Sequence, residues 1–107
     1  MQTVTAGLSE VIDVAPSLSA QRDTASSPLI KSEHLTVVRL EIPAGKHIPP
    51  HHAKGDVTVQ CLKGSIQFTA GDITRSLSSG QLILLAGRDT NSLIATMDST
   101  LLVTVAS

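Results

Sequence analysis

Three of the four histidines of this chain, His47, His51 and His52, lie within six residues around a Pro49–Pro50 pair. An imidazole can bind a transition metal ion or exchange a proton near neutral pH. Catalytic zinc, iron and manganese sites generally use at least three protein donors and keep one position open. The histidine cluster therefore predicts either part of a metal site or a proton-transferring group, depending on the donors that the rest of the chain supplies.

Cys61 is the only cysteine, so the chain cannot form an internal disulfide. It lies in the apolar run Val57–Leu62, and strict alternation would place it on the same inward face as Val57. No Lys, Arg or His adjoins it in the sequence to lower its pKa, so we expect a packed thiol and not a nucleophile. The chain contains no CxxC motif, no GxSxG motif and no phosphate-binding glycine loop.

The composition indicates one small globular domain. The 107 residues are 41% hydrophobic and 16% charged, with a net charge of −1, and Phe68 is the only aromatic residue. No basic stripe of the kind that binds nucleic acid is present, and no apolar run approaches the about 20 residues that span a bilayer. The first ten residues do not resemble a secretory signal, so we expect a cytoplasmic protein without nucleic-acid or membrane partners.

The chain divides into an N-terminal arm, residues 1–28, and a core, residues 29–107, of one domain. The arm is rich in Ser, Thr, Ala and Asp, and Val11–Val14 is its one candidate edge strand. We expect a loop at Ser26–Pro28 before the core begins, because Ser and Pro favour turns.

The core reads as short strands separated by turns. Thr36–Ile42 alternates, with Val38, Leu40 and Ile42 on one face and charged residues on the other. A loop with Pro49–Pro50 and the histidines follows. Further strands are expected at Val57–Leu62, Ser65–Thr69, Ile73–Leu77, Leu82–Leu85, Ser92–Thr96 and Thr100–Val105. Many short strands without helices predict an all-β, antiparallel sandwich or barrel.

Two runs within the predicted strands, Leu82–Leu85 and Leu101–Val103, are apolar on both faces. A strand with one face in water should alternate, so something must cover the outer face of these two. Either the arm folds across them or a second subunit does. We expect a homodimer in which both contribute.

Four residues carry a resemblance to a known family. Gly45, His51 and Gly64 match the pattern G-x5-H-x-H-x3-E-x6-G, and Gly80 opens a segment spaced like G-x5-P-x-G-x2-H-x3-N. These segments resemble the two motifs of the cupin superfamily, and together with the strands between them they cover most of residues 36–105. The resemblance implies an antiparallel double-sheet jelly-roll barrel of the RmlC-like type. It also implies a ligand or metal site between the sheets, near His51 and Asn91.

The departures from the family pattern bear directly on function. The family's second histidine falls on Ala53, its glutamate on Val57 and its last histidine on Asn91, so only His51 remains of four metal ligands. Asp56, the nearest carboxylate, should point to the opposite face from Val57. The resemblance therefore implies a cupin with a degenerate metal site.

Two functions follow from this pattern. The first is a non-catalytic barrel that needs no cofactor and binds a small organic molecule in a pocket formed by His51, Asn91, Val57 and Cys61. The second is a metal-dependent cupin enzyme, of the dioxygenase or isomerase type. Its one divalent transition metal would be held by His51 with His47 or His52. We favour the first, because two loop histidines are the only available replacements for three missing ligands.

Overall fold

The computed structural model describes residues 7–15, 23–51, 53–89 and 91–106, with the backbone alone at Pro50 and His51. The described residues form strands and loops and contain no helix. The strands are β1 (Ala25–Lys31), β2 (Leu35–Ile42), β3 (His47–His51), β4 (Val57–Lys63), β5 (Ser65–Ala70), β6 (Ile73–Ser78), β7 (Leu82–Leu85), β8 (Asn91–Ala95) and β9 (Ser99–Ala106).

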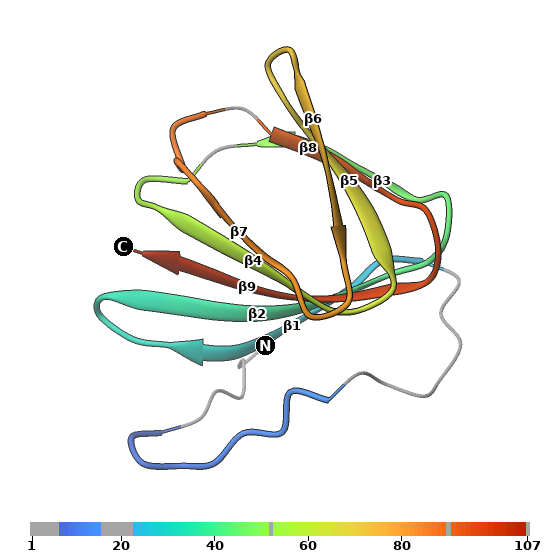
Figure 1. Cartoon of the computed structure of the whole chain (residues 1–107). Helices are drawn as coiled ribbons and strands as arrows, with labels where there is room; N and C mark the ends of the chain where they lie inside the picture. The colour runs from blue at the N-terminus through green and yellow to red at the C-terminus, as the bar shows by residue number, and fades with distance from the viewer. Residues whose placement is uncertain (1–6, 16–22, 52, 90, 107) are drawn as a thin grey trace.

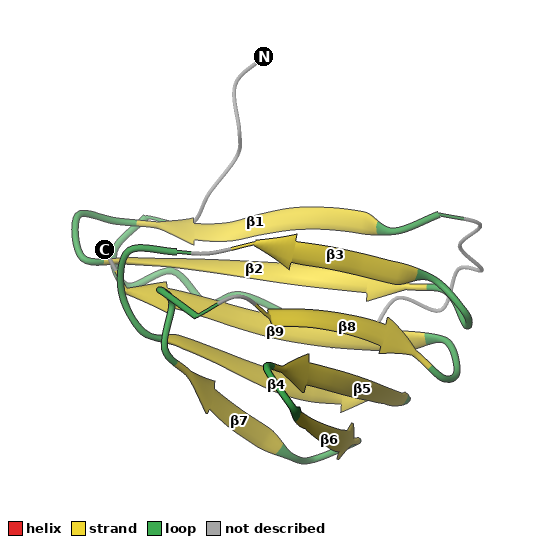
Figure 2. Ribbon diagram, turned by 90° about the horizontal axis from the view of Figure 1, so that it is seen from above, coloured by secondary structure: helices red, strands yellow, loops and turns green. Residues whose placement is uncertain are grey.

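The strands form two facing antiparallel sheets (Figure 1). One sheet has five strands in the order β1-β2-β9-β4-β7, and the other has four in the order β3-β8-β5-β6. Seen from above, the four-stranded sheet lies over the five-stranded one (Figure 2). The predicted all-β, antiparallel double-sheet jelly roll is confirmed, and the predicted strands of the core agree with the observed ones to within one residue at each end.

The core lies between the sheets, where the inward residues of each strand meet. Its buried members come from both sheets: Ile42, Val59, Cys61, Ile66, Phe68, Leu77, Leu93, Ala95 and Leu101. Burying an aliphatic or aromatic side chain of this size stabilises a fold by about 1.5–3 kcal/mol. A core of this kind accounts for folding without a disulfide or a large aromatic cluster.

Two segments that were predicted as loops are strands. The Ser26–Pro28 segment belongs to β1, and the Pro49–Pro50 segment belongs to β3. Each of these strands lies at the edge of its sheet. Proline has no backbone N–H group, and an edge strand tolerates this because one of its sides pairs with no other strand. Each also contains a register shift, between Pro28 and Ile30 in β1 and between Ile48 and His51 in β3. Edge placement and a bulge together explain why loop-like composition forms a strand.

The arm does not contain the predicted edge strand. Val11–Val14 has no strand structure, and Val11 is 99% exposed. The arm instead contacts the outer side of β2, where Arg39 Nη1 donates to the carbonyl oxygens of Asp13 at 3.3 Å and Ala15 at 3.5 Å. Pairing in the sheet begins at Ala25, before the expected start of the core at residue 29.

Candidate functional site

A cavity of about 150 Å³ lies between the two sheets. Its wall includes the first residue of β4, the last of β7 and the first of β8, so it occupies one end of the barrel. The lining residues are Leu40, Ile48, Ala53, Val57, Val59, Phe68, Leu85, Gly87, Asn91, Leu93, Val103 and Val105. Asn91 is the one polar side chain in this lining, and no charged side chain of the described residues contributes to it.

Period-two alternation explains why these residues share the interior. Val57 pairs with Leu85 on one side and Val105 on the other, and Val59 pairs with Val103. Directly opposed residues of antiparallel strands lie on the same face of the sheet. The register of β4 with β7 and β9 therefore places apolar residues from three separate segments side by side in one wall of the cavity.

The Asn91 amide is held in one orientation. Its Nδ2 donates to the carbonyl oxygen of Asp89 at 3.2 Å. A carbonyl oxygen only accepts hydrogen bonds, so the amide nitrogen must face Asp89 and Oδ1 must take the other position. Asn91 Oδ1 is buried and has no hydrogen-bond partner among the residues that the structure describes.

The bulge in β3 determines which residue stands opposite Asn91. Ile48 pairs with Leu93 and His51 pairs with Asn91, so two residues of β3 oppose one residue of β8 between these pairs. Ile48 and Leu93 both line the cavity. The extra residue brings His51 to the register position across from Asn91, as the resemblance implied for these two positions.

No protein-family model and no curated protein matches this chain. Its structure, however, is similar to many solved ones. A cupin superfamily protein from Desulfitobacterium hafniense has a TM-score of 0.78 at 12% identity, with 91% of this chain and 98% of that chain covered. An RmlC-like cupin protein from Desulfovibrio desulfuricans has a TM-score of 0.75 at 22% identity, covering 90% and 97%. This chain has the cupin fold. A conserved Streptococcus pyogenes protein of unknown function is also similar, with a TM-score of 0.76 at 20% identity, covering 94% and 97%.

Two of the positions that the resemblance assigns to metal ligands carry no donor side chain. Ala53 and Val57 stand at these positions, and both line the cavity without a donor atom. Among the described side chains, no group of three or more His, Cys, Asp or Glu is placed to hold a metal. A neutral Asn91 amide is a weak substitute for an imidazole on a transition metal. We therefore derive no reaction step through a metal.

The three clustered histidines are placed differently. His47 is exposed and pairs with Ile94, which is 38% exposed on the outer face of the four-stranded sheet. It does not line the cavity. His51 is defined by its backbone pairing with Asn91, and His52 lies outside the described residues. The structure thus brings His51 and Asn91 to one ladder position but does not bring His47 to the cavity.

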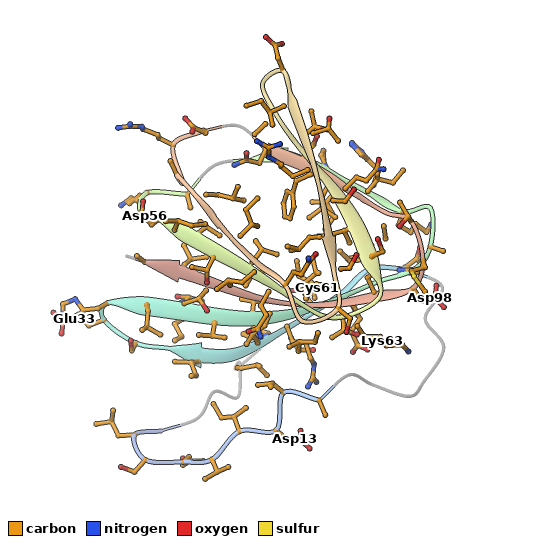
Figure 3. The ribbon with its side chains drawn as sticks, in the orientation of Figure 1. Asp13, Glu33, Asp56, Cys61, Lys63 and Asp98 are labelled. Carbon is orange, nitrogen blue, oxygen red and sulfur yellow. The ribbon has the colours of Figure 1, made fainter. Side chains whose placement is uncertain are left out.

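Cys61 is inward-facing, as alternation predicts, but it lies away from the cavity. It is completely buried in the packed core and is not part of the cavity lining. Figure 3 shows Cys61 inside the barrel, with Asp56 at the opposite end of β4. Its Sγ donates to the carbonyl oxygen of Lys63 at 3.3 Å, and burial raises the pKa of the thiol. The environment of Cys61 is that of an unreactive core thiol.

A close contact between two loops shapes the mouth of the cavity. The Ala53 amide donates to the carbonyl oxygen of Gly87 at 2.7 Å. A Cβ atom on Gly87 would collide with the carbonyl oxygen of Gly55 and come within 2.8 Å of that of Ala53. Gly87 is thus required for close packing of the two loops.

Most of the cavity wall was not identified from the sequence. Val57 and Asn91 were predicted, but Phe68, Leu85 and Leu93 were not, although all three lie on inward positions of their strands. Alternation within each strand would have found the inward face. It does not say which inward residues sit at the open end, because that depends on pairings between distant strands.

Proposed function

We propose that this chain is a small-molecule-binding protein that uses the apolar interior of its cupin barrel without a metal ion. The observation that carries the proposal is the cavity itself: an apolar space between the sheets in which Asn91 is the one polar side chain that the described residues contribute. Ligand sites are typically apolar pockets in which a few polar groups set the orientation. Nucleophilic or acid–base chemistry is not part of the proposal, since no described carboxylate, lysine or cysteine lines the cavity.

The size and chemistry of the cavity limit what it can hold. An apolar protein cavity of about 150 Å³ can bind a molecule of the size of benzene. The cavity lining offers no charged side chain among the described residues to neutralise an ion. A buried ion without a partner is strongly disfavoured. The proposed ligand is therefore compact and uncharged.

NMR titration with benzene and cyclohexane tests the proposal. We expect both probes to shift the amide signals of residues around the cavity, including Val57, Phe68 and Val103. A Val57→Phe variant fills the space and should abolish binding. Val11→Phe makes the same replacement at a residue that is 99% exposed, and it should bind like the wild type. Failure of both probes to bind the wild type, or equal binding by Val57→Phe, would contradict the proposal.

We also propose that the chain forms a homodimer through the outer face of the five-stranded sheet. The outward residues along most of β4, β7 and β9 are uncharged: Thr58, Gln60, Leu62, Leu82, Leu84, Leu102 and Thr104. Lys63, at the end of β4, is the exception. Leu82 and Leu84 on the edge strand β7 are 62% and 66% exposed. The described part of the arm contacts β2 and leaves these leucines uncovered. A second copy is the occupant that we propose, because the exposed leucines of β7 can meet those of a partner across a twofold axis and remove each other's apolar surface from water.

Light scattering at micromolar concentration tests the homodimer. We expect a mass of two chains for the wild type and of one chain for Leu84→Lys. Ile73→Lys is the matched control, because Ile73 is 53% exposed but lies on β6 of the other sheet. It should remain dimeric. A single-chain mass for the wild type would contradict the proposal.

A further inference from the structure

We propose that the cavity ligand is a small neutral alcohol whose hydroxyl group donates a hydrogen bond to Asn91 Oδ1. This inference rests on the proposed function and specifies the ligand of the same cavity. Its starting point is an unsatisfied acceptor: Asn91 Oδ1 is buried and without a partner among the described residues. Buried polar atoms in native proteins nearly always have a partner, so an unpaired one calls for an explanation such as a ligand.

The partner must be a donor. The Asn91 amide cannot turn over to present Nδ2 to the cavity, because that would set Oδ1 against the carbonyl oxygen of Asp89 in place of the present 3.2 Å hydrogen bond. A ketone, ether or carboxylate would bring a second acceptor to Oδ1. An alcohol brings the required O–H group.

A single water molecule is a poor substitute for this ligand. Buried waters usually make about three hydrogen bonds, and polar surroundings are needed to hold them. Among the described side chains around the cavity, Asn91 alone is polar, and the nearby Ala53 amide already donates to the carbonyl oxygen of Gly87 at 2.7 Å. A water there would satisfy Oδ1 but leave most of its own hydrogen bonds unmade against Phe68, Leu93 and other apolar groups.

The rest of the ligand follows from the rest of the wall. Leu40, Val57, Val103 and the other lining residues provide only apolar contact. An ammonium group would also donate to Oδ1, but the described lining has no negative charge to accompany it. A body of benzene size fits about 150 Å³. Together these limits describe a cyclic or branched alcohol of roughly six to eight heavy atoms.

Three probes of one shape test the inference: cyclohexanol with a donor, cyclohexanone with an acceptor only, and methylcyclohexane with neither. Each is titrated by NMR into the wild type and into Asn91→Leu. We expect the variant to lose about tenfold in affinity for cyclohexanol, as the loss of one hydrogen bond to a buried group predicts. Methylcyclohexane should bind the variant at least as tightly as the wild type. For each probe we compare the ratio of its affinities for the wild type and for Asn91→Leu. Using this ratio cancels the intrinsic difference in hydrophobicity between the probes.

The possible results separate the inference from the proposed function. If cyclohexanol and methylcyclohexane both bind but show the same ratio of wild-type to variant affinity, the cavity binds ligands. The inference of a hydrogen bond from the ligand to Asn91 Oδ1 is then wrong. If cyclohexanone shows the tenfold loss and cyclohexanol does not, the amide presents Nδ2 and the inference is also wrong. If no probe binds the wild type, the proposed function itself fails. Should Asn91→Leu not fold, as judged from its amide spectrum, Asn91→Ala replaces it in the same comparison.

Discussion

Asn91 stands opposite His51 in the β3–β8 ladder, and the bulge between this pair and Ile48–Leu93 is what brings the two together. In an unbroken ladder, alternation would place His51 on the face opposite to Ile48. The extra residue within Pro49–Pro50 shifts the alternation of β3 by one residue. His51 therefore pairs with Asn91 in the ladder. Bulges commonly redirect a strand next to a functional site.

Asn91→Leu should stabilise the protein. The change removes a buried oxygen that has no partner among the described residues, and it places an apolar group in an otherwise apolar lining. Leaving such a group unsatisfied costs about 1–3 kcal/mol, whereas the exposed bond to Asp89 that is lost is worth about 0.5–1.5 kcal/mol. Urea denaturation should show a free energy of unfolding about 1 kcal/mol higher than that of the wild type.

Asn91→Asp is the matched control for this stability change. It keeps the shape of the side chain but places an ionisable carboxyl in the apolar cavity, so it should lower the stability at pH 7. Equal destabilisation of Asn91→Leu and Asn91→Asp would mean that Asn91 Oδ1 has a hydrogen-bond partner in solution. It would contradict the prediction that this atom is unpaired.

Metal content distinguishes the proposed binding protein from the alternative enzyme. Protein purified without an affinity tag should contain far less than one transition metal ion per chain, because Ala53 and Val57 replace two donors in the cavity wall. Elemental analysis measures this directly. A content near one ion per chain that disappears in His51→Ala and persists in His47→Ala would support the metal-dependent alternative, since His47 is exposed on the outer face.

The sequence was sufficient to predict the fold because the core strands follow simple rules. Val57 and Val59 point inward, as alternation predicts, and β4 and β5 are separated by Gly64 alone. The edge strands β1 and β3 could not be predicted in this way. Their Ser and Pro residues have a loop composition, and they form strands only because a neighbouring strand supplies the pairing. Edge strands depend on tertiary contacts more than on their own propensities.

The candidate site was predicted less completely than the fold. Asn91 and Val57 were identified from motif spacing and lie in the cavity wall, whereas Cys61 shares their inward direction but sits in the closed core. Alternation specifies the face of a residue and not its depth along the barrel. The depth is determined by register: Cys61 pairs with Leu101, which is fully buried, whereas Val57 pairs with Val105 at the cavity.

Gly64→Ala should destabilise the fold much more than Gly71→Ala. Both glycines have a positive φ, of 94° and 59°, so either alanine is strained by about 1–2 kcal/mol. At Gly71 a Cβ atom meets nothing within 4 Å, but at Gly64 it would collide with Ser99 Oγ and the carbonyl oxygen of Asp98. Overpacking adds about 1–3 kcal/mol. Equal losses of unfolding free energy in the two variants would contradict this steric explanation.

The cost at Gly64 has a specific cause in the hydrogen bonds of Ser99. Ser99 Oγ accepts from the Ser65 amide at 3.0 Å and donates toward the carbonyl oxygens of Met97 at 2.7 Å and Ser65 at 3.1 Å. This hydroxyl ties the start of β5 to the start of β9. A methyl group on Gly64 would displace it, so Ser99→Ala should reduce the difference between Gly64→Ala and the wild type in a double-mutant cycle.

Cys61 should be inert to thiol reagents in the folded protein. It is completely buried, its pKa is raised by that burial, and only the thiolate reacts. Labelling at pH 8 should therefore proceed only through unfolding. Its rate should increase in step with the unfolded fraction as urea is added, whereas rapid labelling without urea would show that the closed end of the barrel opens in the native state.

The raised pKa of Cys61 also predicts a loss of stability in alkali. Below the ordinary value of 9.0 the thiol is protonated in both the folded and the unfolded chain. Above it the unfolded chain releases the proton while the folded chain retains it, so the free energy of unfolding falls by up to about 1.4 kcal/mol per pH unit until the folded pKa is passed. Cys61→Ala removes this titration, at a cost of about 1 kcal/mol from the small cavity left in the core. The stability difference between wild type and variant, measured in urea from pH 7 to pH 10.5, should therefore shrink above pH 9. A constant difference would mean that burial does not hold the proton on Cys61.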